Sequence, residues 1–261
     1  MPKKSRKNSR HNSHHNNVVN PYFEENGAPR DSGRKTNNAD WHPLDENIDG
    51  RRDKKYVKNI KPRSAGQAKL MQAIDEYNLT LAVGPAGTGK TYIAISKAVE
   101  ALEKGQIERI ILSRPAMEAG ESIGYLPGGL DEKMAPYLRP LYDALGDRMG
   151  GKKVRQYLSD GTIEIAPVGF MRGRTLNNSY VVIDEAQNCT YGQLKMLLSR
   201  LGWHSTMIVT GDPDQSDLLD GVSGLADIMN RMKPLKNVAV CELGSADIVR
   251  HPLVAEMLTV L

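Results

Sequence analysis

The sequence predicts an α/β fold built on a mostly parallel β-sheet, with helices covering both faces of the sheet. Six short apolar runs alternate with longer segments of helical periodicity, and a glycine-rich turn joins the first run to a helix. Runs that are apolar throughout indicate strands buried on both faces, and strands that alternate with helices indicate parallel pairing. The expected strands are Leu79–Val83, Arg109–Ser113, Thr162–Ala166, Tyr180–Ile183, Thr206–Thr210 and Asn237–Cys241.

The turn after the first strand matches the pattern of a phosphate-binding loop. Residues 84–91 read GPAGTGKT, which satisfies G-x-x-x-x-G-K-[ST]. Glycines let the backbone curl so that its N–H groups point at phosphate oxygens, and the following helix adds the positive end of its dipole. We expect Lys90 to reach the β- and γ-phosphates and Thr91 to bind Mg²⁺ through its hydroxyl. The predicted loop consists of Gly84, Pro85, Ala86, Gly87, Thr88, Gly89, Lys90 and Thr91.

The helices are predicted from apolar residues at three- and four-residue spacing. Gln67–Glu76 has one such face, and the helix after the glycine-rich turn continues to a stop at Gly105. The pattern changes between Gly120 and Met171, where Glu132–Leu145 again has helical spacing. We expect this segment to form a helical insertion over the edge of the sheet.

The fourth expected strand ends in two adjacent acids, in the sequence YVVIDEAQN. Both acids should lie at the carboxyl edge of the sheet, where open α/β sheets bind their ligands. We expect Asp184 to hold Mg²⁺ through its water, together with Thr91. Glu185 is expected to polarise a water for attack on a γ-phosphate, which would distinguish a hydrolase from a nucleotide binder. Helix capping is the alternative for such a pair.

The fifth expected strand leads into the sequence TGDPDQ, which offers an amide at Gln215. An amide at this edge can hydrogen-bond a γ-phosphate or the attacking water. A polar turn closed by Pro213 is the alternative. On the first interpretation, Lys90, the two acids and Gln215 come from three strand ends and surround one triphosphate.

Charge is unevenly distributed along the 261 residues. Residues 1–64 carry 15 Lys and Arg against 8 Asp and Glu, whereas the remainder carries 20 against 23, so the first part supplies the net charge of +4. Residues 1–56 also lack apolar periodicity, and we expect a disordered basic arm that either binds a nucleic-acid backbone or stays solvated. Two cysteines without a CxxC pair, and no apolar run long enough to span a membrane, favour a cytoplasmic protein.

The order of the motifs resembles that of the PhoH-like ATPases. GPAGTGKT, SRPAMEAGE, EKMAPYLRPLYDAL, IAPVGFMRGRTL, VIDEAQN, VTGDPDQSDL and DIVRHPLV follow one another as in that family, within residues 57–257. The family is similar to the first RecA-like domain of superfamily 1 helicases. The resemblance implies a RecA-like P-loop NTPase domain over residues 57–261, with ATP and Mg²⁺ as cofactors. It also implies that Gln67 contacts adenine, with an ordinary surface glutamine as the alternative.

The resemblance bears on partners as well. Two-domain helicases take a charge-stabilising arginine from their second RecA-like domain, and this chain has room for only one such domain. The resemblance therefore implies a homo-oligomer, with a hexameric ring as its form. Arg172, Arg174 and Arg250 are the candidates for this arginine, and structural ion pairing is the alternative for each. Residues 113–121 fall where related helicases contact nucleic acid.

These observations predict a Mg²⁺-dependent ATP hydrolase that acts on single-stranded RNA or another nucleic acid, with helicase-like remodelling. The main alternative is a nucleotide-dependent switch that docks a partner such as a ribonuclease without unwinding. Only two Phe and two Trp occur in the chain, so an aromatic stacking stripe is not evident, which favours the switch. A small-molecule kinase is less well supported, because no acceptor-binding motif is found.

Overall fold

The computed structural model describes residues 60–115, 130–219 and 221–249, together with Leu253 and Met257. All of them belong to one structural unit. The basic arm expected over residues 1–56 lies outside these ranges, as does Arg250.

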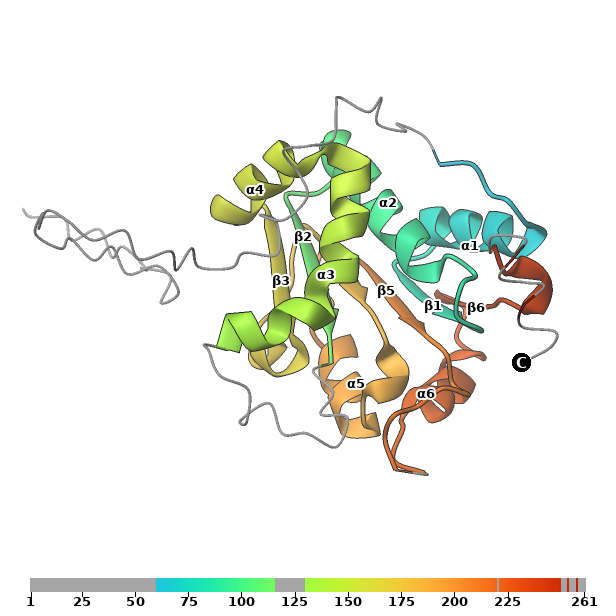
Figure 1. Ribbon diagram of the computed structural model, residues 1–261. Coiled ribbons are helices and arrows are strands. Elements are labelled where there is room, and N and C mark those ends of the chain that lie inside the picture. Colours follow the sequence, from blue (N-terminus) through green and yellow to red (C-terminus); the bar gives the residue numbers. More distant parts are fainter. Residues whose placement is uncertain (1–59, 116–129, 220, 250–252, 254–256, 258–261) are drawn as a thin grey trace, which may run out of the picture. The chain divides into compact units, whose positions relative to one another are not determined.

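Six strands form one sheet in the order β3-β2-β4-β5-β1-β6 (Figure 1), and every neighbouring pair is parallel. This confirms the predicted parallel sheet, and each predicted strand end lies within one residue of the observed one. Apolar runs locate buried strands well because both faces of such strands need apolar side chains. The strands are β1 Leu79–Val83, β2 Arg109–Arg114, β3 Ile163–Pro167, β4 Ser179–Ile183, β5 Thr206–Gly211 and β6 Val238–Glu242.

The strand order decides which loops meet. β5 lies between β1 and β4, with Leu81 opposite Val209 in one pair and Val181 opposite Met207 in the other. Because all three strands are parallel, their carboxyl ends lie at the same edge of the sheet. The glycine-rich turn, the acid pair and the TGDPDQ sequence therefore leave the sheet side by side.

Two apolar cores cover the two faces of the sheet. Consecutive residues of one strand enter opposite cores: Ile110 and Leu112 pack with helices α1 to α4, whereas Ile111 packs with α5 and α6. This is the two-residue alternation of a strand whose faces are both buried. The helices are α1 Ala65–Glu76, α2 Lys90–Glu103, α3 Leu130–Met149, α4 Gly151–Ser159, α5 Tyr191–Leu198 and α6 Leu225–Met232.

The predicted helical insertion, Glu132–Leu145, lies within α3, and a second helix that was not predicted, α4, follows it. Helix α4 packs on β3, which is one of the two edge strands, and α3 packs on α2 and β2 (Figure 1). Leu141 and Leu145 of α3 are fully buried in the first core. Within the described ranges, no helix has both the length and the apolar content needed to cross a bilayer.

Candidate functional site

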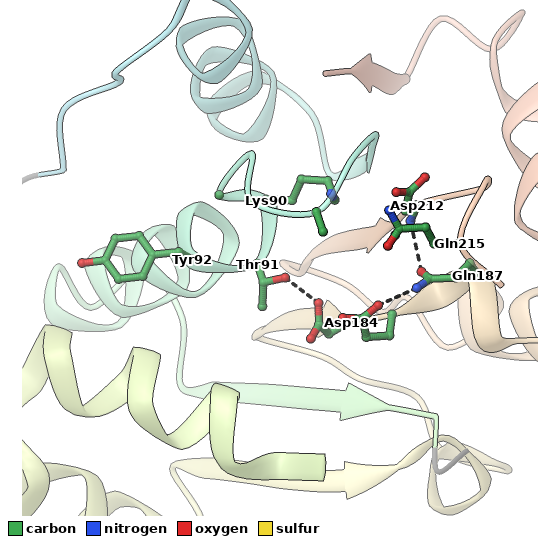
Figure 2. Close-up of a pocket in the computed structure, with 12 residues that line it drawn as sticks. Lys90, Thr91, Tyr92, Asp184, Gln187, Asp212 and Gln215 are labelled. Carbon is green, nitrogen blue, oxygen red and sulfur yellow. Dashed lines mark hydrogen bonds between the residues drawn. The ribbon is translucent and has the colours of Figure 1, made fainter. Parts of the chain in front are cut away.

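A pocket of about 310 Å³ opens at the carboxyl edge of the sheet. Its walls come from the glycine-rich turn with the start of α2, from the chain after β4, and from the end of β5. Figure 2 shows Lys90, Thr91, Asp184, Gln187 and Gln215 around this pocket. The lining residues are Ala86, Gly87, Gly89, Lys90, Thr91, Tyr92, Asp184, Glu185, Gln187, Gly211, Asp212 and Gln215.

The glycine-rich turn takes the backbone shape that a P-loop needs. Gly84, Gly87 and Gly89 have φ angles of 137°, 84° and 82°, a region that other residues rarely adopt. A Cβ on Gly84 would also lie 2.2 Å from the carbonyl oxygen of Leu243, so no larger residue fits there. Thr88 closes the turn by donating its hydroxyl to the Pro85 carbonyl, at 2.8 Å. The turn leads directly into α2, whose N-terminus faces the pocket.

Lys90 lies over this turn and is largely buried. Its Nζ donates to the carbonyl oxygens of Gly84 and Pro85, at 2.5 and 2.8 Å, and to Thr88 Oγ1 at 3.3 Å. Burial lowers the pKa of the Lys90 ammonium below its usual value, and the charges of Asp212, Glu185 and Asp184 oppose this shift. The Lys90 ammonium is therefore largely removed from water and held by uncharged carbonyl oxygens. An anion in the pocket can take the place of these oxygens as its hydrogen-bond partner.

Asp184 is 3% exposed and is fixed by hydroxyl groups from two different elements. Its Oδ1 accepts hydrogen bonds from Thr91 Oγ1 at 2.6 Å and from Thr210 Oγ1 at 2.7 Å. Its Oδ2 faces the guanidinium of Arg114, with Nη1 at 3.4 Å. The carboxylate thus joins the first turn of α2 to the ends of β5 and β2.

Glu185 follows in a strained backbone conformation, with a φ angle of 53°. Strain of this kind costs about 1–3 kcal/mol and persists only where the surroundings hold it, often at functional sites. Its side chain is 38% exposed and reaches Arg114 Nη2 at 3.4 Å through Oε1. Its Oε2 accepts a hydrogen bond from Gln187 Nε2 at 2.5 Å. The carboxylate is therefore oriented by two partners and still open to the pocket.

Gln187 links the acid pair to the end of β5. Its Oε1 accepts a hydrogen bond from the backbone N–H of Asp212 at 3.1 Å, while its Nε2 donates to Glu185. This approach requires Gly211, because a Cβ there would lie 2.8 Å from the Gln187 Oε1. Gln215 completes the turn after β5 by donating its backbone N–H to the Asp212 carbonyl, at 3.1 Å, and its side chain lines the pocket.

A second pocket of about 370 Å³ lies beside the first and contains Gln67. This glutamine is 6% exposed. Its Nε2 donates to the Thr88 carbonyl at 2.9 Å, and its Oε1 accepts from the Arg63 N–H at 2.8 Å. Tyr92 and Gly89 line both pockets. Gln67 is therefore a buried residue that braces the glycine-rich turn, rather than an ordinary surface glutamine.

The candidate arginines lie apart from the pocket or outside the described residues. Arg174 forms a two-pronged ion pair with Glu164 of β3, and its Nη2 donates to Oε2 at 2.7 Å. Arg174 is thus in the alternative arrangement that the sequence allowed, a structural ion pair. Arg172 is exposed, and neither residue lines the pocket.

Three residues that hold the acid pair in place were not given this role from the sequence. Arg114 belongs to residues 113–121, where the resemblance implies a nucleic-acid contact, and residues 116–121 lie outside the described residues. Arg114 directly follows the run RIILS at the same sheet edge, and Thr210 is a hydroxyl at the end of a buried apolar strand. Gln187 lies two positions after Glu185, within the same motif. A polar residue at the carboxyl end of a central strand was the available signal in the first two cases.

The family model described as "PhoH-like protein" matches residues 59–261. The chain belongs to the PhoH-like family. Its fold is the α/β fold that the sequence predicted, a parallel six-stranded sheet flanked by helices.

Relatives in the PhoH-like family share about half of the aligned residues. The chain is 52% identical over 202 residues to the PhoH-like protein of Bacillus subtilis (strain 168), covering 77% of this chain and 63% of the relative. It is 44% identical over 205 residues to Protein PhoH of Escherichia coli (strain K12), covering 77% and 58%. The chain therefore spans less than two thirds of the length of these relatives.

One solved structure with a similar arrangement is the large terminase of a thermophilic bacteriophage. The match has a TM-score of 0.48 and 12% identity, and it covers 76% of this chain and 50% of that chain.

Proposed function

We propose that this PhoH-like chain binds ATP with Mg²⁺ and hydrolyses it. The observation that supports this most directly is that Lys90, Thr91, Asp184, Glu185 and Gln215 line one pocket. The loop amides and Lys90 bind the phosphates, and Glu185 orients and deprotonates the attacking water. Gln215 hydrogen-bonds the γ-phosphate or that water.

The residues around Asp184 fit a magnesium site. Thr91 Oγ1 and Asp184 Oδ1 lie 2.6 Å apart and at the mouth of the P-loop, so one hydroxyl and one carboxylate converge on the same place. Magnesium prefers a few protein oxygens and takes its remaining ligands from waters and phosphates. When bound, Mg²⁺ would neutralise charge on the phosphates. Within this chain, Thr91 and Asp184 would hold it.

The second pocket supports a place for the nucleobase. It adjoins the P-loop at Gly87 and Gly89, and it has apolar walls from Ile60 and Met71. Gln67 projects an amide into it, which can donate one hydrogen bond and accept another. We propose that adenine occupies this pocket and contacts Gln67, which also donates a hydrogen bond to the Thr88 carbonyl of the P-loop.

Replacing Thr91 with valine tests the metal assignment. The side chain keeps its shape and loses the hydroxyl that meets Asp184. We expect Mg²⁺-dependent phosphate release to fall about 10- to 100-fold, because one ligand of the ion is lost, while ADP binding in EDTA changes little. Thr206→Val makes the same exchange at the amino end of β5, away from the pocket, and should hydrolyse ATP like the wild type. Equal rates for both variants would contradict the assignment.

We further propose that the protein uses ATP hydrolysis to act on RNA in the cytoplasm and that its active form is a homo-oligomer. The excess of positive charge in residues 1–64 supports a polyanionic partner. Because Arg174 is paired with Glu164, the charge-stabilising arginine of each site would come from a neighbouring subunit or from Arg250.

Single-stranded RNA is therefore expected to stimulate ATP hydrolysis several-fold, and RNA binding should weaken steeply as salt rises. The measurement is phosphate release with and without RNA over a series of KCl concentrations. Turnover that no nucleic acid alters would favour the alternative, a switch that docks a partner such as a ribonuclease. Capture of that partner in the presence of ATP but not ADP would then support the switch.

A further inference from the structure

Arg114 is a charged residue of the site to which the proposed reaction gives no role. It is the last residue of β2, and its guanidinium spans the acid pair. Nη1 lies 3.4 Å from Asp184 Oδ2, and Nη2 lies 3.4 Å from Glu185 Oε1. Among the residues that the structure describes, no other basic nitrogen lies within 4.0 Å of either carboxylate.

The other two carboxylate oxygens already have neutral partners. Asp184 Oδ1 accepts hydrogen bonds from Thr91 and Thr210, and Glu185 Oε2 accepts one from Gln187. The two remaining oxygens face the same guanidinium. Adjacent carboxylates repel each other, most strongly where water is largely excluded, and the positive charge of Arg114 offsets part of this repulsion.

The contact is loose enough to be given up. Charge-assisted hydrogen bonds of arginine usually measure about 2.7–2.9 Å, which is clearly shorter than either contact of Arg114. The pair between Arg174 and Glu164, at 2.7 Å for one of its bonds, shows what a closed arginine–carboxylate contact looks like in this chain. The Arg114 side chain is also 20% exposed, so part of it already contacts water.

We propose that Arg114 is a placeholder cation, which offsets part of the negative charge of Asp184 and Glu185 when no Mg²⁺ is bound and is displaced when Mg²⁺ binds beside Asp184. This inference rests on the proposed Mg²⁺–nucleotide site. A divalent ion next to Asp184 repels the guanidinium, so the two cations compete for one carboxylate. Arg114 is thus a positioning residue: it holds the acid pair together when no metal is bound and weakens net metal affinity.

The test compares the dissociation constant of a fluorescent ADP in EDTA and in Mg²⁺. The constant in EDTA divided by the constant in Mg²⁺ measures how strongly the binding of metal favours the binding of nucleotide. Arg114→Ala is expected to raise this ratio about tenfold, through tighter binding in Mg²⁺. Arg114→Lys keeps the charge and should stay near the wild type. Arg109→Ala removes the same charge from the amino end of β2, about 17 Å away along the strand, and should change nothing.

Each result decides between explanations. An unchanged ratio in Arg114→Ala overturns the inference. Equally weaker ADP binding in both buffers also overturns it, because that result means that Arg114 contacts the nucleotide. Wild-type protein that binds ADP equally with and without Mg²⁺, or not at all, overturns the proposed function and this inference together. Circular dichroism of each variant shows that the comparison is made on folded protein. If the alanine variant does not fold, Arg114→Gln removes the charge while keeping a longer side chain and is expected to raise the ratio in the same way.

Discussion

Glu185→Gln is expected to leave ATP bound and to lower its hydrolysis at least about a hundredfold, because general-base catalysis typically contributes about 10²- to 10⁴-fold. Glutamine keeps the length of the side chain and its contact with Gln187, but it cannot accept a proton from water. The Lys90, Thr91 and Asp184 contacts are unaffected, so affinity for nucleotide should be retained. Phosphate release and binding of a fluorescent ATP analogue measure the two effects separately.

A matched control is Glu108→Gln, which makes the same exchange on an exposed side chain just before β2, at the opposite edge of the sheet. Its hydrolysis rate should equal that of the wild type. A Glu185→Gln protein that turns over ATP at the wild-type rate would remove Glu185 from the reaction. Loss of binding and hydrolysis together would instead give the residue a role in holding the nucleotide.

The sequence predicted the fold closely because the central strands β2, β4 and β5 contain short continuous apolar runs, IIL, VVI and MIV. Val181 to Ile183 and Met207 to Val209 are buried, and a short continuous apolar run of this kind is typical of a strand with both faces covered. Within the described residues, no helix could span a membrane. The P-loop was equally predictable from the sequence, since its three glycines take positive φ angles that other residues rarely adopt. Both signals are local in sequence.

The partners of long polar side chains could not be predicted in the same way. Arg114 ends β2 and Arg174 comes after β3, yet Arg114 faces the acid pair and Arg174 pairs with Glu164. Which carboxylate an arginine meets depends on the strand order, in which β2 is next to β4 and β3 lies at the edge. Gln187 was missed for a related reason, because its bridge to Asp212 exists only once β4 and β5 are neighbours.

Lys90→Ala is expected to weaken nucleotide binding by about a hundredfold or more. The variant loses the ammonium that would bind the β- and γ-phosphates, and a charge-assisted hydrogen bond of this kind is among the strong ones in proteins. Stability of the empty protein should change little. Burial disfavours the charged form of Lys90, as its lowered pKa indicates, so the folded state keeps this cation at a cost. Fluorescent ATP titration and thermal unfolding without nucleotide measure the two quantities.

Lys104→Ala serves as the comparison, since Lys104 lies just beyond the other end of α2, is exposed, and pairs with Glu100 at 2.6 Å. Exposed pairs of this kind contribute little, so neither affinity nor unfolding should change measurably. Wild-type affinity in Lys90→Ala would mean that the loop amides alone hold the phosphates, and the buried ammonium would then need another reason to be there. A large loss of stability without nucleotide would supply one, because it would make Lys90 a structural brace for the carbonyls of Gly84 and Pro85.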